Sequence, residues 1–250
     1  MSAPVFLVEP GELAGAADTF WLRGAEARHA AVVQRRGLGE LVDVADGAGT
    51  RVIGQVVEAG ADGVRLAVLE VRHEPRAHPA LVLVQALAKG DRDERAIEAA
   101  TEVGVDVVLP WQAARSIVVW RGERAAKSRA LWLGTVRAAA KQSRRSWVPQ
   151  VESAVDTCAL AARVADVVGA GGACLVLHEE ASTPIAQASL PDGGELLVVV
   201  GPEGGIAPAE LDALVQAGAC AVRLGPHVLR TSTAGPVALA LLAERLGRWA

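Results

Sequence analysis

The chain has 250 residues, of which 51% are apolar, and a formal net charge of −4 at pH 7. This length suits one large domain or two small ones with a buried core, and no run approaches the roughly 18 apolar residues of a membrane span. The N-terminus lacks the pattern of a signal peptide, which favours the cytoplasm, and the acidic balance excludes a globally basic nucleic-acid-binding protein.

The first seventy-odd residues show the pattern of a small β-barrel. Strands are expected at 4–8, 40–45, 51–58 and 63–72, with a tight turn at Asp46-Gly47 and one short helix at 25–34. The segment 73–79 contains two prolines and several polar residues, which is typical of a domain boundary. We therefore expect one domain at 1–74 and a second at 75–250.

After residue 79, apolar strands alternate with helices, which predicts an α/β domain with a mostly parallel sheet. Asp91 and Glu94 have the spacing of a capping box at the start of one helix, and Gly104 is placed to end it. The expected strands are 81–87, 107–110, 174–178, 196–200 and 222–224, and the expected helices start at 91, 123, 208 and 233.

Three cysteines, Cys158, Cys174 and Cys220, stand far apart in apolar or Ala-rich segments. An odd number at wide spacing suits neither a disulfide framework nor a zinc site. We expect all three to be small buried side chains, and we expect no metal.

Positive charge is concentrated between Arg115 and Arg145, where nine basic residues accompany a single acid, Glu123, for a net charge of +8. Arg137, Lys141 and Arg145 recur at helical spacing and share one face, and such a stripe can follow RNA phosphates. A solvated helix face is the alternative. This basic run consists of Arg115, Arg121, Arg124, Lys127, Arg129, Arg137, Lys141, Arg144 and Arg145.

Two Gly-containing loops follow apolar strands near the C-terminus. Residues 200–205 read Val-Gly-Pro-Glu-Gly-Gly, and residues 224–231 read Leu-Gly-Pro-His-Val-Leu-Arg-Thr. Ligands of open α/β sheets bind at the carboxyl ends of strands, and glycine lets backbone groups approach them closely. Neither loop is a phosphate-binding motif, so nucleotides are weak candidates, and composition alone does not identify the ligand.

These loops, in this order, resemble those of the RsmE family, the SPOUT-class methyltransferases that modify N3 of a uridine in 16S ribosomal RNA. Segments 98–105 and 139–149 match as well, and the resemblance extends over nearly the whole chain. It implies a PUA-like β-barrel that grips RNA, a trefoil-knotted C-terminal SPOUT domain that binds S-adenosylmethionine, and a homodimer. The sequence departs from the family at Ser232, where the family has Glu, and at Lys141 and Arg144, where it has Glu and Gly.

The resemblance also implies roles for individual residues. Because uridine N3 must lose a proton, Arg230 is expected to stabilise the developing anion, and Glu203 is expected to orient the cofactor or to act as a base. RNA contacts are expected from His29, Arg35, Arg36, Lys141, Arg144 and Arg145. The residues expected to hold the cofactor are Leu177, His178, Glu179, Val200, Gly201, Pro202, Glu203, Gly204, Gly205, Leu224, Gly225, His227, Val228, Leu229, Arg230 and Thr233.

Two other functions remain open from the sequence. One is a SPOUT methyltransferase that acts on another RNA atom, such as a ribose 2′-oxygen, or on another RNA. The other is a non-catalytic RNA-binding protein of ribosome assembly that has kept the fold, for which Ser232 is the sole support. Binding of S-adenosylmethionine discriminates the second alternative from both methyltransferases.

Overall fold

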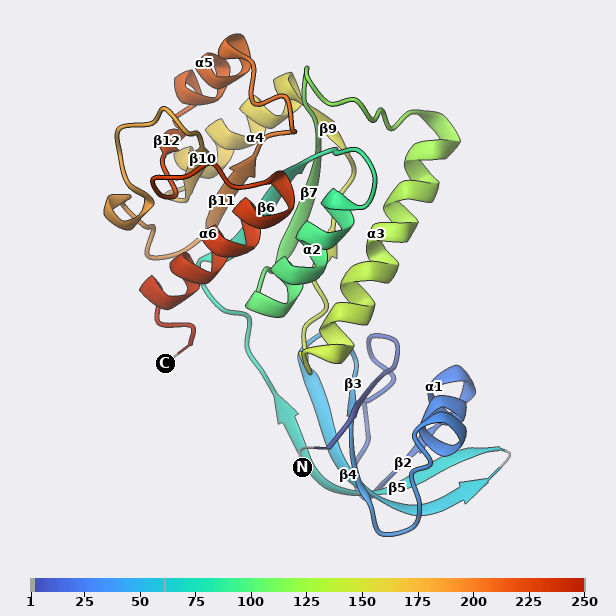
Figure 1. Ribbon diagram of the computed structural model, residues 1–250. Helices are drawn as coiled ribbons and strands as arrows, with labels where there is room; N and C mark the ends of the chain where they lie inside the picture. The colour runs from blue at the N-terminus through green and yellow to red at the C-terminus, as the bar shows by residue number, and fades with distance from the viewer. Residues whose placement is uncertain (1–2, 61, 250) are drawn as a thin grey trace. The chain divides into compact units, whose positions relative to one another are not determined.

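The computed structural model describes residues 3–60 and 62–249, which form two compact units (Figure 1). The first unit contains the chain up to Arg76 together with Ala140–Val148. The second contains Ala77–Ala139 and the chain from Pro149 onward. The sequence pattern gave no sign that residues 140–148 pack with the first unit, and the boundary expected near residue 74 stays a prediction.

The first unit is built on a five-stranded sheet with the order β1-β3-β4-β5-β2, in which only the β1–β3 pair is parallel. Register shifts between β4 and β5 bend this long hairpin, as bulges do. The expected helix is present as α1 (Gly24–Arg28), continued by a π-helical turn (His29–Val33). The strands are β1 (Val5–Leu7), β2 (Thr19–Leu22), β3 (Leu41–Ala45), β4 (Thr50–Gly60) and β5 (Gly63–His73).

The second unit contains the predicted parallel sheet, with the order β12-β10-β11-β6-β7-β8 and β9 beside β7. Every pairing in it is parallel, so the expected mostly parallel sheet is confirmed. Its central strands are apolar runs buried on both faces, as such sheets require. The strands are β6 (Ala80–Ala86), β7 (Val107–Gln112), β8 (Gln150–Val151), β9 (Val155–Asp156), β10 (Ala173–Leu177), β11 (Glu195–Val200) and β12 (Cys220–Val222).

Helices cover both faces of this sheet (Figure 1). Helix α2 (Arg92–Val103) packs against α6 (Thr231–Arg245) on one face, and α4 (Thr157–Gly169) packs against α5 (Pro208–Gln216) on the other. The basic helix is α3 (Gly122–Gln142), and its last residues group with the first unit. Helix α6 starts two residues before the expected position, so Thr231 is its first residue. No helix in the described part of the chain is long and apolar enough to cross a membrane.

The start of α2 differs from the expected capping box. Asp91 has φ −105° and ψ 14° and not the extended conformation of a capping residue, so its side chain makes no cap bond and instead pairs with Arg95 at 2.7 Å. The buried Asp93, in the first turn of α2, accepts hydrogen bonds from the Glu94 amide at 2.9 Å and from the Ala88 amide at 3.4 Å, which links the helix to the loop before it. Gly104 ends the helix at φ 108°, as predicted.

The cysteines also correct an expectation. Cys174 is buried in β10, but Cys158 and Cys220 are exposed. Cys158 lies in the first turn of α4 and Cys220 opens β12, which is an edge strand, so neither side chain is enclosed. All three thiols are free.

Candidate functional site

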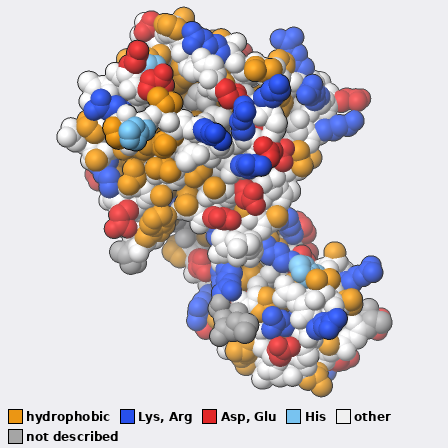
Figure 2. All heavy atoms as spheres, viewed as in Figure 1, with side chains coloured by type: hydrophobic (Ala, Val, Ile, Leu, Met, Phe, Trp, Pro, Cys, Tyr) orange, Lys and Arg blue, Asp and Glu red, His pale blue; other side chains and the backbone are white. Residues whose placement is uncertain are grey.

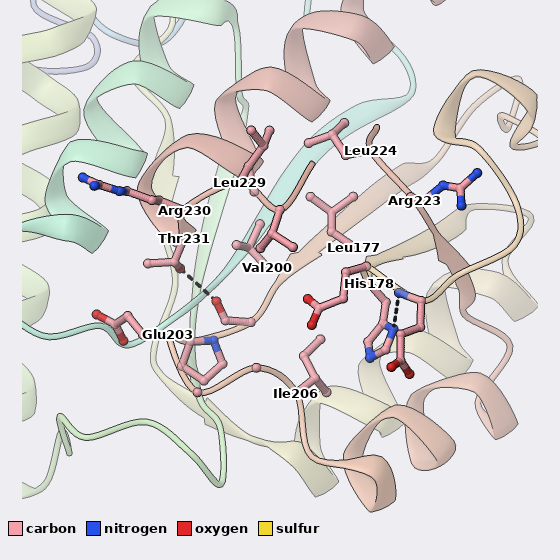
Figure 3. A pocket seen from close by; sticks show the side chains of 18 of the residues that line it. Leu177, His178, Val200, Glu203, Ile206, Arg223, Leu224, Leu229, Arg230 and Thr231 are labelled. Atoms are coloured by element: carbon pink, nitrogen blue, oxygen red, sulfur yellow. Dashed lines mark hydrogen bonds between the residues drawn. The ribbon is translucent and has the colours of Figure 1, made fainter. Parts of the chain in front are cut away.

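A cavity of about 990 Å³ lies where the loops after β10, β11 and β12 leave the sheet. These strands are parallel neighbours, so their carboxyl ends share one edge and the three loops converge there. Figure 3 shows Leu177, Val200 and Leu229 forming an apolar middle. His178 and Arg223 lie toward one end of the cavity, and Glu203 and Arg230 toward the other.

The loop after β11 needs glycine at two positions for different reasons. A Cβ on Gly201 would stand 2.7 Å from Ile206 Cγ1, which is too close for any side chain. Gly205 has φ +72°, a conformation that side-chain-bearing residues rarely adopt. The loop therefore presents bare backbone to the cavity.

A chain of buried hydrogen bonds fixes this loop to the start of α6. Thr231 Oγ1 donates to the Gly201 carbonyl at 2.8 Å, the contact dashed in Figure 3. The same hydroxyl accepts a hydrogen bond at 3.0 Å from Nε2 of Gln85, which lies near the end of β6. Thr231 adjoins Arg230, the N-cap of α6, so both Gly-containing loops are held from one point.

Glu203 is engaged by the loop that follows β6 and by the first residue of α2. Its Oε1 accepts hydrogen bonds from Arg92 Nη1 at 2.6 Å and from the Lys89 amide at 3.1 Å. Desolvation by itself would raise the pKa of Glu203, but the hydrogen bond from Arg92 and those from backbone amides outweigh it and lower the pKa. A carboxylate held in this way is a poor proton acceptor, so the geometry favours an orienting role.

Two arginines at the cavity are placed differently. Arg115 follows β7, and its Nη1 donates to the Gly204 carbonyl at 2.8 Å. Arg230 is exposed, and within residues 3–60 and 62–249 no hydrogen bond or ion pair engages its guanidinium. Arg230 is therefore available to a ligand, as its expected role requires.

The segment after β10 supplies the third wall. His178 Nδ1 accepts a hydrogen bond from the Glu180 amide at 3.3 Å, as Figure 3 shows. In neutral His178 this contact places the proton on Nε2, which can then donate to a ligand. His178 can therefore close the turn after β10 and contact a ligand at the same time.

The structure brings together all the residues expected to hold the cofactor except Thr233, which is exposed and does not line the cavity. Arg92 and Arg115 were missed, although both follow strands that end at the same sheet edge, which was the available signal. The other lining residues that the sequence did not single out are Glu180, Ile206, Pro208, Arg223, Pro226, Thr231 and Ala234.

Two of the expected RNA contacts, Lys141 and His29, instead bind side chains of the first unit. Lys141 Nζ lies 2.6 Å from Glu26 Oε2 and 3.1 Å from His29 Nδ1, so its charge is neutralised within the fold. Arg36 pairs with Glu40 at 3.0 Å on the surface.

The remaining RNA candidates lie in backbone turns of the same unit. Arg35 and Arg144 have left-handed φ values of 52° and 59°, and the Arg144 carbonyl accepts a hydrogen bond from Arg51. RNA binding by Arg35, Arg144 and Arg145 stays a prediction.

The chain matches the family model described as an RNA methyltransferase domain over residues 75–243. It is 49% identical to the ribosomal RNA small subunit methyltransferase E of Mycobacterium bovis over 226 residues, which is 90% of this chain and 86% of that protein. It is 34% identical to the Bacillus subtilis protein of the same name over 235 residues, covering 91% and 90%.

The fold has a close structural counterpart. The crystal structure of ribosomal RNA small subunit methyltransferase E from Neisseria gonorrhoeae, bound to S-adenosylmethionine, superposes with a TM-score of 0.84 over 98% of each chain at 26% identity. This similarity spans both units and confirms the expected fold class, a SPOUT domain preceded by a PUA-like barrel. The chain belongs to the RsmE family of RNA methyltransferases, the ribosomal RNA small subunit methyltransferases E.

Proposed function

We propose that this protein transfers a methyl group from S-adenosylmethionine to N3 of a uridine in the 16S ribosomal RNA of the small subunit. The observation that carries the proposal is the unengaged guanidinium of Arg230 at a cavity whose lining includes the glycines of both Gly-containing loops. The names of the relatives support the RNA, and the solved neighbour with S-adenosylmethionine supports the cofactor.

The residues present fit this cofactor. Leu177, Val200 and Leu229 offer an apolar surface to an adenine ring, while the backbone of the two Gly-containing loops offers amide and carbonyl groups to its edges. His178 Nε2 can donate to a hydroxyl of the ribose. When bound, the cofactor supplies an electrophilic methyl group on a sulfonium.

The chain's own residues then have to manage the N3 proton of uridine. As that proton leaves, negative charge develops on the two flanking carbonyl oxygens, and the Arg230 guanidinium is suited to stabilise it. Glu203 is held by Arg92, and its lowered pKa makes it unsuited to accept the proton. Its function in the proposed mechanism is to fix the loop between Gly201 and Gly205.

The proposal includes a homodimer. Val228, Leu229, Val237 and Leu241 expose apolar side chains on and just before α6, and Figure 2 shows hydrophobic side chains gathered over this helix. Contiguous exposed apolar surface is typical of an interaction site. It also includes a cytoplasmic location, where the small subunit is assembled, an RNA-gripping role for the domain at 1–74, and no metal.

The test combines two measurements on one preparation. Calorimetric titration measures S-adenosylmethionine binding, and the protein is then incubated with small-subunit particles that lack the modification. Mass spectrometry of the digested RNA identifies the product nucleoside. We expect binding and 3-methyluridine. A different methylated nucleoside would keep the fold and overturn the substrate, and absence of binding would leave a non-catalytic RNA-binding protein.

A further inference from the structure

Gln85 is a polar residue in the otherwise apolar strand β6, and its side chain is fully buried. Its Nε2 donates to Thr231 Oγ1 at 3.0 Å and to the Ala86 carbonyl at 3.3 Å. Its Oε1 is also buried, and no residue in the described ranges 3–60 and 62–249 offers that oxygen a hydrogen bond. Buried polar atoms are nearly always satisfied, so this acceptor requires a reason.

The polarity of the hydrogen-bond chain supplies the reason. The Gly201 carbonyl can only accept, so the single hydroxyl hydrogen of Thr231 must be donated to it. The hydroxyl oxygen is then left as an acceptor, and Gln85 must present its amide nitrogen to it. This orientation turns Oε1 away from Thr231 and leaves it without a partner. With the Thr231 hydrogen on the Gly201 carbonyl, a rotated amide would place Oε1 against two acceptors, Thr231 Oγ1 and the Ala86 carbonyl.

We propose that Gln85 and Thr231 are positioning residues that fix the Gly201 carbonyl and the start of α6 in one mutual arrangement. Gly201 opens the loop expected to hold the cofactor, and Thr231 follows Arg230 directly, so this link sets the cofactor loop and the proposed catalytic cation relative to each other. The fold tolerates an unsatisfied core acceptor because the opposite end of the same amide sets the geometry of the site. The inference rests on the proposed function for its consequence in catalysis.

An apolar side chain of similar shape separates this role from a purely structural one. Gln85→Met removes the unsatisfied oxygen together with the donor, so the variant is expected to melt at the same temperature as the parent protein or above it. Loss of the link is expected to weaken S-adenosylmethionine binding about tenfold and to lower kcat by a similar factor, as for one lost hydrogen bond. A residue that only supports the fold would lose stability first.

Two substitutions of Thr231 test the same link, one that breaks it and one that keeps it. Thr231→Val removes the hydroxyl and is expected to reproduce the weaker binding of Gln85→Met, whereas Thr231→Ser keeps the hydroxyl and is expected to restore most of it. Thr101→Val is the matched control, because it removes a buried hydroxyl from α2, which donates to the Ile97 carbonyl at 2.7 Å. That change is expected to lower the melting temperature and to leave cofactor affinity within twofold.

A second readout does not require the cofactor. Backbone amide hydrogen exchange in residues 200–206 is expected to become about tenfold faster in Gln85→Met at unchanged global stability, and in Thr231→Val to accelerate by more than the change in global stability of that variant accounts for. Unchanged exchange in this loop, or a Gln85→Met protein with parental affinity and kcat, would overturn the inference. If the parent protein fails to bind S-adenosylmethionine, the proposed function fails, and the exchange data still decide whether the link positions the loop.

Discussion

The two Gly-containing loops and the basic run both stand out in the sequence. In the structure the loops meet at one cavity, whereas the basic residues are divided between the two units. Segments far apart in the chain converge on the cavity because their strands end at one sheet edge. Residues of the basic run instead bind different parts of the protein. Arg115 donates to the Gly204 carbonyl, Arg129 to the Val151 carbonyl, and Lys141 to the Glu26 carboxylate. Strand ends therefore locate a site, whereas a run of like charge does not by itself define a surface.

Arg230→Ala is the sharpest test of this contrast, because Arg230 lies at the start of α6 beside both Gly-containing loops and no described residue engages its guanidinium. Loss of a group that stabilises a developing oxyanion reduces kcat roughly 10²–10³-fold, and we expect that loss here with cofactor affinity changed only a few-fold. Single-turnover methylation of small-subunit RNA measures it.

Arg95→Ala is the control for Arg230→Ala, since it removes an exposed arginine of the same unit that pairs with Asp91 outside the cavity. A kcat for Arg230→Ala equal to that of Arg95→Ala would withdraw the catalytic role.

Within the basic run, the comparison predicts different outcomes for neighbouring residues. Reversing two charges in Arg144→Glu with Arg145→Glu is expected to weaken RNA binding at least tenfold and to lower its salt slope by about two. Lys141→Met removes a cation that is mostly buried against Glu26, so its main expected effect is a loss of about 1–2 kcal/mol in the free energy of unfolding.

RNA binding at several salt concentrations, together with thermal melts, measures both variants. A salt slope that falls more for Lys141→Met than for the double reversal would show that the intramolecular pair opens when RNA binds.

Much of this arrangement could be predicted from sequence, and the parts that could not have physical reasons. The apolar strands and the glycine loops carry local signals, so β6, β11 and the loop after β11 were placed nearly as observed. The four residues of β2 have a weak local pattern and depend on tertiary packing, whereas α4 was missed although Leu160, Val164 and Val167 recur at helical spacing. Contacts between distant segments, such as those that engage Glu203, leave no trace in local composition.

Breaking the ion pair between Arg92 and Glu203 is expected to have a smaller effect than Arg230→Ala. Both side chains are partly exposed, so solvent screens the pair, and Arg92→Ala is expected to weaken cofactor binding only about threefold to tenfold. Glu203→Gln keeps the contact with the Lys89 amide and is expected to lose less.

Calorimetry with S-adenosylmethionine measures the affinity of both variants, and the pH dependence of kcat tests Glu203 further. Because the pKa of Glu203 lies below its ordinary value, the profile of Glu203→Gln is expected to match that of the parent protein. Loss of an acidic limb in the Glu203→Gln profile would identify Glu203 as the proton acceptor.

The smallest expected effect concerns Asp93, which lies in the first turn of α2 and accepts a hydrogen bond from the Ala88 amide in the loop after β6. Burial raises its pKa to about 6, against a value near 3.8 in the unfolded chain, and the hydrogen bonds from the Ala88 and Glu94 amides only partly offset this. The folded protein therefore binds the proton more tightly than the unfolded chain does. Stability contributed by the protonated carboxyl is present below pH 4 and is lost as pH rises through 6.

Asp93→Asn removes this titration, so its melting temperature relative to the parent protein is expected to increase between pH 4 and about 6.5 and then to stay level. The increase should be on the order of a few degrees for a chain of this size. Asp91→Asn changes an exposed acid at the same helix start and should show no such trend. A difference that is constant from pH 4 to pH 8 would mean that Asp93 stays ionised throughout, and that its two backbone amides, not burial, determine its charge.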